Sequence, residues 1–181
     1  NCLMFNSSLL GFRTWNVFDN RLYPLNLRKK LPDRNEGESL VVATTRAYIG
    51  SDLGWKPGPN KAVCVIGDRR ESGSPHPSHH CGFNAFFDLS EAQLYRRAMD
   101  TNILGAVAGS GTLEIHSTGY RAERAQLVAL LAQTEIQEIN GCSLAEYYSV
   151  PLFYDPEEFV EYVSSQTPHI SNFRTEKNYN E

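Results

Sequence analysis

Residues 11–26 read GFRTWNVFDNRLYPLN, and this stretch predicts the first strands of the fold. Apolar and polar side chains alternate up to Val17, and apolar residues resume at Leu22 after the pair Asp19-Asn20. Alternation sends one row of side chains to a core and the other toward water, and Asp-Asn suits a tight turn. The stretch therefore predicts a β-hairpin.

Other apolar or β-branched runs predict further strands. In the Gly-Ser-Gly sequence at 109–111, the glycines precede alternating Leu113 and Ile115, which indicates a bulge or tight turn between paired strands. Residues 51–61 place Gly and Pro around Trp55, which predicts a loop held by one large side chain. The remaining strands are predicted at 40–49, 61–66, 82–87 and 150–153.

Helices are predicted mainly in the C-terminal half. The longest runs from Ala122 to about Glu138, because apolar residues recur there at three- and four-residue spacing, and Asn140-Gly141 is expected to end it. Three shorter helices are predicted, from Glu91 after the N-cap Ser90, from Ser143, and from Pro156 after the N-cap Asp155.

These elements predict an α+β fold. A bent antiparallel sheet would be packed by the long helix of the C-terminal half, with a metal-stapled loop between strands. The chain has 181 residues, of which 41% are hydrophobic, and this is enough to bury a core. We expect a single domain over residues 11–165, a leader or non-native remnant at 1–10, and a polar, mobile tail at 166–181.

A group of Cys and His residues lies in a polar stretch between two predicted strands. Two thiolates and two imidazoles form a ligand set that zinc accepts in tetrahedral geometry. The loop between the cysteines has almost no apolar content, so metal bonds would order it where burial cannot. The sequence therefore predicts a structural zinc site within eighteen residues, with Cys64, His76, His79 and Cys81 as ligands and His80 as the alternative to His79.

Other interpretations of these residues stay open. Cys64 lies in an apolar run, where a cysteine is commonly a small buried hydrophobic residue, and a histidine pair is commonly solvated. A disulfide between Cys64 and Cys81 is a further alternative, which a reducing cytoplasm would disfavour. A zinc-dependent hydrolase or other metal enzyme would need an open coordination position and a general base, and neither HExxH nor the deaminase pattern is present.

Several short motifs follow one another along the chain: W-x-P-G-x-x-x-A-x-C at 55–64, His76-Pro77, C-G-F-x-A at 81–85, G-Y-R-A-E at 119–123 and Y-x-V-P at 148–151. Together they resemble a group of uncharacterised proteins from actinobacteria and their phages. In that group the middle motif is C, then H-x-x-P, then C-x-C-G-[IF]-Y-A, and the likeness spans residues 11 to about 165. Where the group has the first Cys of C-x-C, this chain has His79, which favours zinc over an iron–sulfur cluster. The resemblance implies a phage-related role and no particular activity.

The G-Y-R-A-E motif offers one more candidate. Arg121 would either contact an anion or a partner protein, or pair with a carboxylate while Tyr120 packs on the sheet, and we favour the pairing. Glu123 is expected in the first turn of the long helix, where the helix dipole stabilises a carboxylate. His116 follows Ile115 on a predicted strand and is expected to face away from the core.

Charge and hydropathy limit the classes of function. A net charge of −4 does not favour nucleic acid or an anionic membrane, and no stretch approaches the roughly 20 apolar residues of a membrane helix. Gly109-Ser110-Gly111 leads into a strand rather than a helix, so a phosphate-binding loop is not expected there. We expect a cytoplasmic binding or regulatory protein, with enzymatic activity left open. The sequence does not identify its protein partner, small ligand or oligomeric state.

Overall fold

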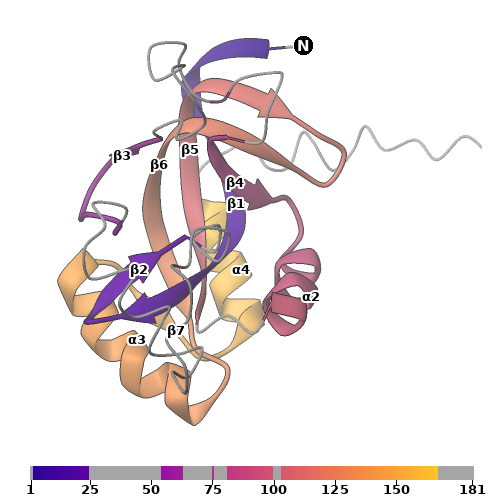
Figure 1. The fold of residues 1–181 in the computed structure, drawn as a ribbon. Coiled ribbons are helices and arrows are strands. Elements are labelled where there is room, and N and C mark those ends of the chain that lie inside the picture. Colours follow the sequence, from indigo (N-terminus) through magenta and orange to yellow (C-terminus); the bar gives the residue numbers. More distant parts are fainter. Residues whose placement is uncertain (1, 25–53, 63–74, 76–80, 100–102, 167–181) are drawn as a thin grey trace, which may run out of the picture.

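The computed structural model describes residues 2–24, 54–62, 75, 81–99 and 103–166 (Figure 1). Within these residues the chain has an α+β fold, as predicted, with a mixed and mostly antiparallel sheet. The strands are β1 (Cys2–Phe18), β2 (Arg21–Tyr23), β3 (Asn60–Lys61), β4 (Phe83–Phe86), β5 (Ile103–Ile115), β6 (Gly119–Leu131) and β7 (Leu152–Phe153). The helices are α2 (Leu89–Met99), α3 (Glu135–Tyr148) and α4 (Pro156–Ser165).

The central strands close into a ring. β1 pairs with β5 and β5 pairs with β6, both antiparallel and over most of their lengths. β4 pairs with β6 and also with β1, where Phe12 lies opposite Phe86. The sheet therefore bends until β4 joins its two sides. Three short strands extend it: β2 antiparallel to β1, β3 antiparallel to β6, and β7 parallel to β6.

Tyr120 fills the space inside this ring. Its side chain is 2% exposed, and its hydroxyl donates a hydrogen bond to Leu9 O at 2.8 Å. Gly109 faces the aromatic ring, and a Cβ added there would lie 2.3 Å from Tyr120 Cε2. Gly11 is equally tight, with Tyr120 Cε1 at 2.8 Å from a built Cβ. Glycine at both positions lets the strands approach the phenol ring closely.

The helices cover the two faces of the sheet, as Figure 1 shows. Leu144 and Tyr148 of α3 belong to one buried cluster, together with Trp15 of β1. Phe159 of α4 and Ala92 of α2 belong to a second cluster on the opposite face. Burial of a side chain such as Phe159 contributes about 2 kcal/mol, so these contacts hold the helices to the sheet. None of the described helices is long and apolar enough to cross a membrane.

The predicted helix from Ala122 to Glu138 is wrong over its first ten residues, which form most of β6. Ala125, Leu127, Ala129 and Leu131 are all buried, whereas the intervening Arg124 and Gln126 are exposed and Val128 is partly buried. This is the two-residue period of a strand, and it is hidden because other apolar residues stand beside it. β6 has hydrogen-bonded neighbours on both edges, and this pairing outweighs the helix propensity of Ala, Leu and Gln.

The main C-terminal helix instead begins after Thr134, whose hydroxyl caps it by accepting from Gln137 N. It continues through Asn140-Gly141, which were expected to end a helix, and includes the short helix predicted from Ser143. Gly141 lies close to β7, because a Cβ there would lie 3.0 Å from Leu152 Cδ1. The long helix of the prediction is thus a helix of 14 residues placed further along the chain.

Several local predictions are confirmed. Asp19 and Asn20 form the hairpin turn with φ angles of 45° and 54°, the left-handed backbone of a tight hairpin. The pairing of β5 with β6 shifts register between Ser110 and Leu113, where the bulge was predicted. Asp155 caps α4 by accepting from Glu157 N at 2.7 Å and Glu158 N at 3.0 Å.

The predicted N-terminal boundary of the domain differs from the structure, and several predicted segments lie outside the described residues. Residues 2–10, expected to be a leader outside the domain, form the first part of β1, and Leu9 and Leu10 are buried. The predicted strand at 40–49, most of the one at 61–66 and the tail from 167 onward lie outside the described residues.

Candidate functional site

One of the four predicted zinc ligands lies within the described residues. Cys81 comes two residues before β4 and is 9% exposed. Cys64, His76 and His79 lie outside those residues, and so does His80. In the part of the chain that is described, no three His, Cys, Asp or Glu side chains form a group that could hold a metal ion. The zinc site therefore stays a prediction.

Two described segments flank the stretch of sequence that carries the predicted ligands, and both contact β6 at the same place. After β3, Ala62 N donates a hydrogen bond to Glu123 O at 2.7 Å. At the start of β4, Phe83 pairs with Ala122. Ala122 and Glu123 are consecutive, so the chain leaves this edge of β6 and returns to it at neighbouring positions.

Pro75 supplies a second fixed point in the same stretch. It is buried, and a Cβ added at Gly82 would lie only 3.1 Å from Pro75 Cβ, so the two residues pack closely. Gly82 has φ of 105°, a conformation that other residues rarely adopt. His76 directly follows Pro75 and Cys81 directly precedes Gly82, so two of the predicted ligands are attached to residues that pack together.

Arg121 joins β6 to β5 and to the segment that precedes β4. Its side chain is buried and forms a salt bridge through Nη2 with Glu114 on β5. Its Nη1 donates to Cys81 O at 3.3 Å. The prediction that Arg121 pairs with a carboxylate is confirmed. His116 is 47% exposed and lies 3.5 Å from the same Glu114, which agrees with its predicted position away from the core.

Two carboxylates near this site have shifted acidities. Burial acts to raise the pKa of Glu114, but the hydrogen bond and charge of Arg121 outweigh it and lower the pKa overall. Glu123 was predicted to lie in the first turn of a helix, and this is wrong, because it lies in β6. The hydrogen bond from Thr112 N, 3.1 Å away, lowers the pKa of Glu123, and the Thr112 hydroxyl adds to the effect.

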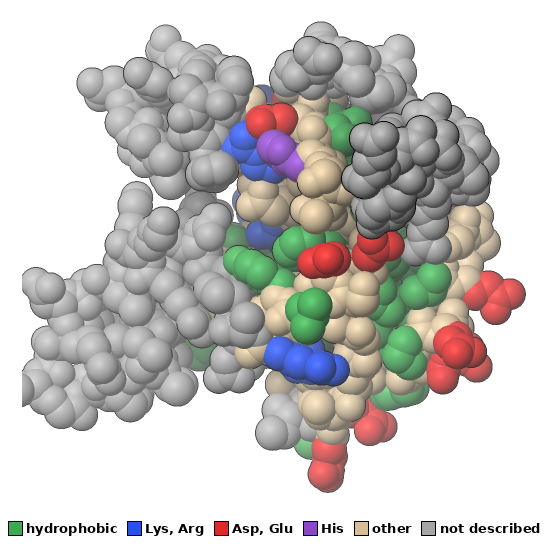
Figure 2. Space-filling view, turned by 90° about the vertical axis from the view of Figure 1, so that its right-hand side faces the viewer, with side chains coloured by type: hydrophobic (Ala, Val, Ile, Leu, Met, Phe, Trp, Pro, Cys, Tyr) green, Lys and Arg blue, Asp and Glu red, His purple; other side chains and the backbone are tan. Residues whose placement is uncertain are grey.

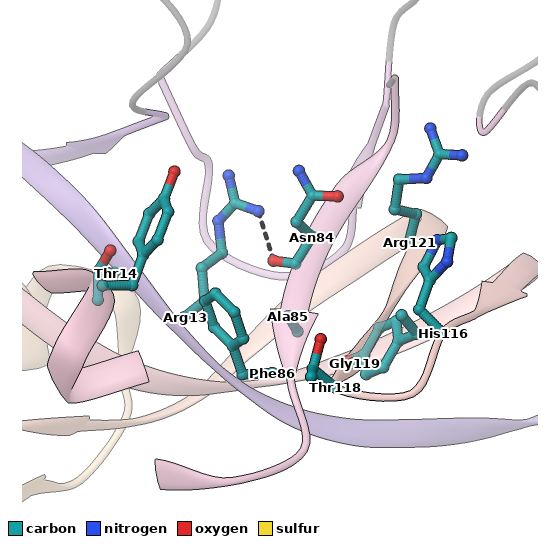
Figure 3. A pocket seen from close by; sticks show the side chains of 11 residues that line it. Arg13, Thr14, Asn84, Ala85, Phe86, His116, Thr118, Gly119 and Arg121 are labelled. Carbon is teal, nitrogen blue, oxygen red and sulfur yellow. Dashed lines mark hydrogen bonds between the residues drawn. The ribbon is translucent and has the colours of Figure 1, made fainter. Parts of the chain in front are cut away.

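A pocket of about 360 Å³ lies along β4 (Figure 3). Figure 3 shows Arg13, Asn84, Arg121 and His116 pointing to the same side of the strand. Other lining residues are Phe86, Tyr95, Thr118 and Tyr120. The pocket therefore combines several positive or polar groups with aromatic walls, which is the usual composition of a small-molecule site.

Arg13 reaches this pocket from β1. Its Nη1 donates to Asn84 O at 2.6 Å, which links β1 to β4 next to their single backbone pairing. The guanidinium also lies over two indole rings, 6.0 Å from the centroid of Trp15 and 5.6 Å from that of Trp55. Burial lowers the pKa of Arg13 to about 10, so the side chain stays charged at neutral pH.

Arg13 was missed from the sequence. It stands between Gly11 and Trp15 in the alternating hairpin stretch, on the row of side chains that faces the core. A single charge within such an inward row was the signal that could have singled it out.

In comparisons with known proteins, no protein-family model, curated protein or solved structure matches the chain significantly. The structure defines an α+β protein with a ring-closed, mostly antiparallel sheet and a pocket beside its shortest ring strand. The resemblance to actinobacterial and phage proteins stays a prediction.

Proposed function

We propose that this chain is a non-enzymatic binding or regulatory protein in which a structural zinc ion closes the sheet edge between β3 and β4. The observation that carries the proposal is the meeting of the two described chain ends at Ala122 and Glu123. The proposed ligands are Cys64, His76, His79 and Cys81, with His80 as the alternative to His79.

The length of chain available fits this site. A chain extends by at most about 3.5 Å per residue, and Cys64 follows Ala62 by two positions while Cys81 precedes Phe83 by two. Each thiol is therefore within about 7 Å along the chain of a residue fixed on β6. Two thiolates bound to one tetrahedral zinc lie about 4 Å apart, a separation that these short segments can reach.

The surroundings of Cys81 favour a structural zinc over a catalytic one. A catalytic zinc keeps one coordination position open to water or substrate. Cys81 is only 9% exposed, and its carbonyl accepts from the buried Arg121. This supports the non-enzymatic role over the alternative of a zinc-dependent hydrolase. A link to phages rests on the sequence resemblance alone.

Elemental analysis of the purified chain and of single Cys→Ser variants tests the proposal. We expect about one zinc per chain in the native protein, and loss of zinc and of thermal stability in Cys64→Ser and Cys81→Ser. Cys142→Ser is the matched control, because Cys142 is exposed and its only described partner is the Tyr154 hydroxyl at 3.7 Å. Native protein without zinc, or equal loss in the control, would contradict the proposal.

The same measurement decides between the two neighbouring histidines. His79→Ala should lose the metal and His80→Ala should keep it, since His79 occupies the position of the thiol in the related motif. The reverse result would exchange the two residues and leave the site itself in place.

A further inference from the structure

We propose that the pocket along β4 binds a small molecule through a phosphate or carboxylate group, with Arg13 as the residue that binds the oxyanion. This inference rests on the proposed binding role and names the class of ligand. It does not depend on the zinc site, because none of the proposed zinc ligands lines the pocket among the residues that the structure describes.

The first argument is the charge of Arg13. The described salt bridges join Glu114 to His116 and Arg121, and Glu123 to Arg124. None of them includes Arg13, so no carboxylate of the described chain neutralises it.

The titratable groups that act on Arg13 are the phenol side chains of Tyr95 and Tyr120, and neither is a carboxylate. Arg13 is partly buried, and charged side chains that lose contact with water are normally paired with an opposite charge. An oxyanion in the pocket would supply that charge.

The second argument is a cluster of hydrogen-bond donors without acceptors. Arg13 Nε, Trp15 Nε1 and Trp55 Nε1 are buried, and none has a hydrogen-bond partner in the described structure. The three side chains touch, since the two indole rings are 5.2 Å apart and the guanidinium lies over both. Buried donors without a partner are rare in proteins. Arg13 is the member of this cluster that lines the pocket, so its guanidinium is the group that a bound oxyanion would contact, with the two indoles behind it.

The third argument is the shape of the pocket. Its volume of about 360 Å³ lies at the small end of the range for ligand sites. Phe86 and Tyr95 form an aromatic wall, with ring centroids 5.4 Å apart, and Asn84, His116 and Thr118 add polar groups.

A compact apolar body with one oxyanion fits this lining. The planar guanidinium of Arg13 suits phosphate and carboxylate oxygens, which it can bind in pairs. Figure 2 shows one face of the molecule, on which a histidine side chain lies beside acidic and basic side chains, with exposed hydrophobic side chains below them.

Thermal unfolding in inorganic phosphate and in benzoate, at constant ionic strength against chloride, tests the inference. We expect at least one of the two to raise the Tm of the native chain with the logarithm of its concentration, by about 4 °C at roughly ten times its Kd. Phosphate alone would indicate a phosphate ligand, and benzoate alone a carboxylate ligand. Arg13→Gln should weaken the binding about thirtyfold, as expected for loss of a charged hydrogen bond.

Arg124→Gln is the matched control, because it makes the same charge change on an exposed side chain outside the pocket. The chain has only two Trp residues, Trp15 and Trp55, so their fluorescence reports the site in the native protein even if Arg13→Gln fails to fold. The inference is overturned if neither anion changes the Tm and the fluorescence of the native chain. It is also overturned if Arg13→Gln and Arg124→Gln weaken anion binding equally. If zinc is present and neither anion binds, the anion site alone fails.

Discussion

Two arginines on neighbouring sides of β4 have opposite surroundings. Arg121 is enclosed by partners from the protein, with the carboxylate of Glu114 on one side and the carbonyl of Cys81 on the other. Arg13 has one backbone acceptor and two indole rings, and no carboxylate of the described chain pairs with it. Arg121 thus has a countercharge within the protein, whereas Arg13 has none among the described residues. This difference assigns Arg121 to the framework and Arg13 to binding.

The largest effect is expected where Arg121 borders the proposed zinc site. Removing zinc with a chelator, or the Cys81→Ser change, should lower Tm by about 10 °C, because a structural site contributes a stabilisation of several kcal/mol. Differential scanning calorimetry of the native protein and of Cys142→Ser, with and without chelator, measures it. An unchanged Tm after chelation would show that zinc does not stabilise the fold.

A smaller effect is expected from the salt bridge of Arg121. Glu114→Gln leaves the buried guanidinium without a countercharge and should cost about 2 kcal/mol, between the values typical of exposed and buried pairs. Glu123→Gln is the matched control, because both carboxylate side chains are 22% exposed and Glu123 pairs with the exposed Arg124. Glu123→Gln should lower the free energy of unfolding by about 1 kcal/mol, because it weakens the hydrogen bonds from Thr112. Equal losses of unfolding free energy in the two variants, measured in urea, would show that the salt bridge with Arg121 adds no stability beyond that of an exposed pair.

The pH dependence of stability should separate the two arginines as well. The folded state lowers the pKa of Glu114 and Glu123, so their contribution is full above the unfolded pKa of about 4.3 and is lost as pH falls through the lower folded values. Glu114→Gln should therefore flatten the acid side of the stability curve. Arg13→Gln should leave that side unchanged, since no carboxylate pairs with Arg13. Urea midpoints between pH 6 and pH 3 measure both curves, and a flattened curve for Arg13→Gln would point to a carboxylate partner.

The smallest effect on stability is expected from Arg13 itself. Arg13→Gln in buffer without phosphate or carboxylate should change the free energy of unfolding by less than about 1 kcal/mol. The substitution loses contacts with two indole rings and a hydrogen bond, but it also removes a charge that lacks a countercharge. A loss as large as that of Glu114→Gln, measured by urea unfolding in the same buffer, would make Arg13 a framework residue.

The sequence predicted the features that depend on a few neighbouring residues. The turn at Asp19-Asn20 and the cap at Asp155 follow from local backbone preferences, and both form as expected. Trp55 was expected to anchor a loop, and it is 2% exposed. Such features need no knowledge of the rest of the fold.

Features that depend on distant partners were missed or misplaced. Residues 122–131 have the composition of a helix, and only strands on both edges of β6 make them a strand. The charge of Arg13 within an inward-facing row was visible in the sequence, but its surroundings were not, because Trp55 and Asn84 come from distant parts of the sequence. Arg121 was interpreted correctly, although nothing in the sequence connected it with Glu114. Of the predicted zinc ligands, the structure describes Cys81 alone.

The most direct test of this account is one ¹⁵N–¹H NMR experiment on the native chain, recorded before and after phosphate or benzoate and then after a zinc chelator. The account predicts that the effective anion shifts the indole signals of Trp15 and Trp55 and leaves the amides of Cys81 and Phe83 in place. The chelator should do the opposite, because Cys81 does not line the pocket, and Arg121, which does, is held by Glu114. Both reagents acting on the same signals, or neither acting on any, would contradict the account.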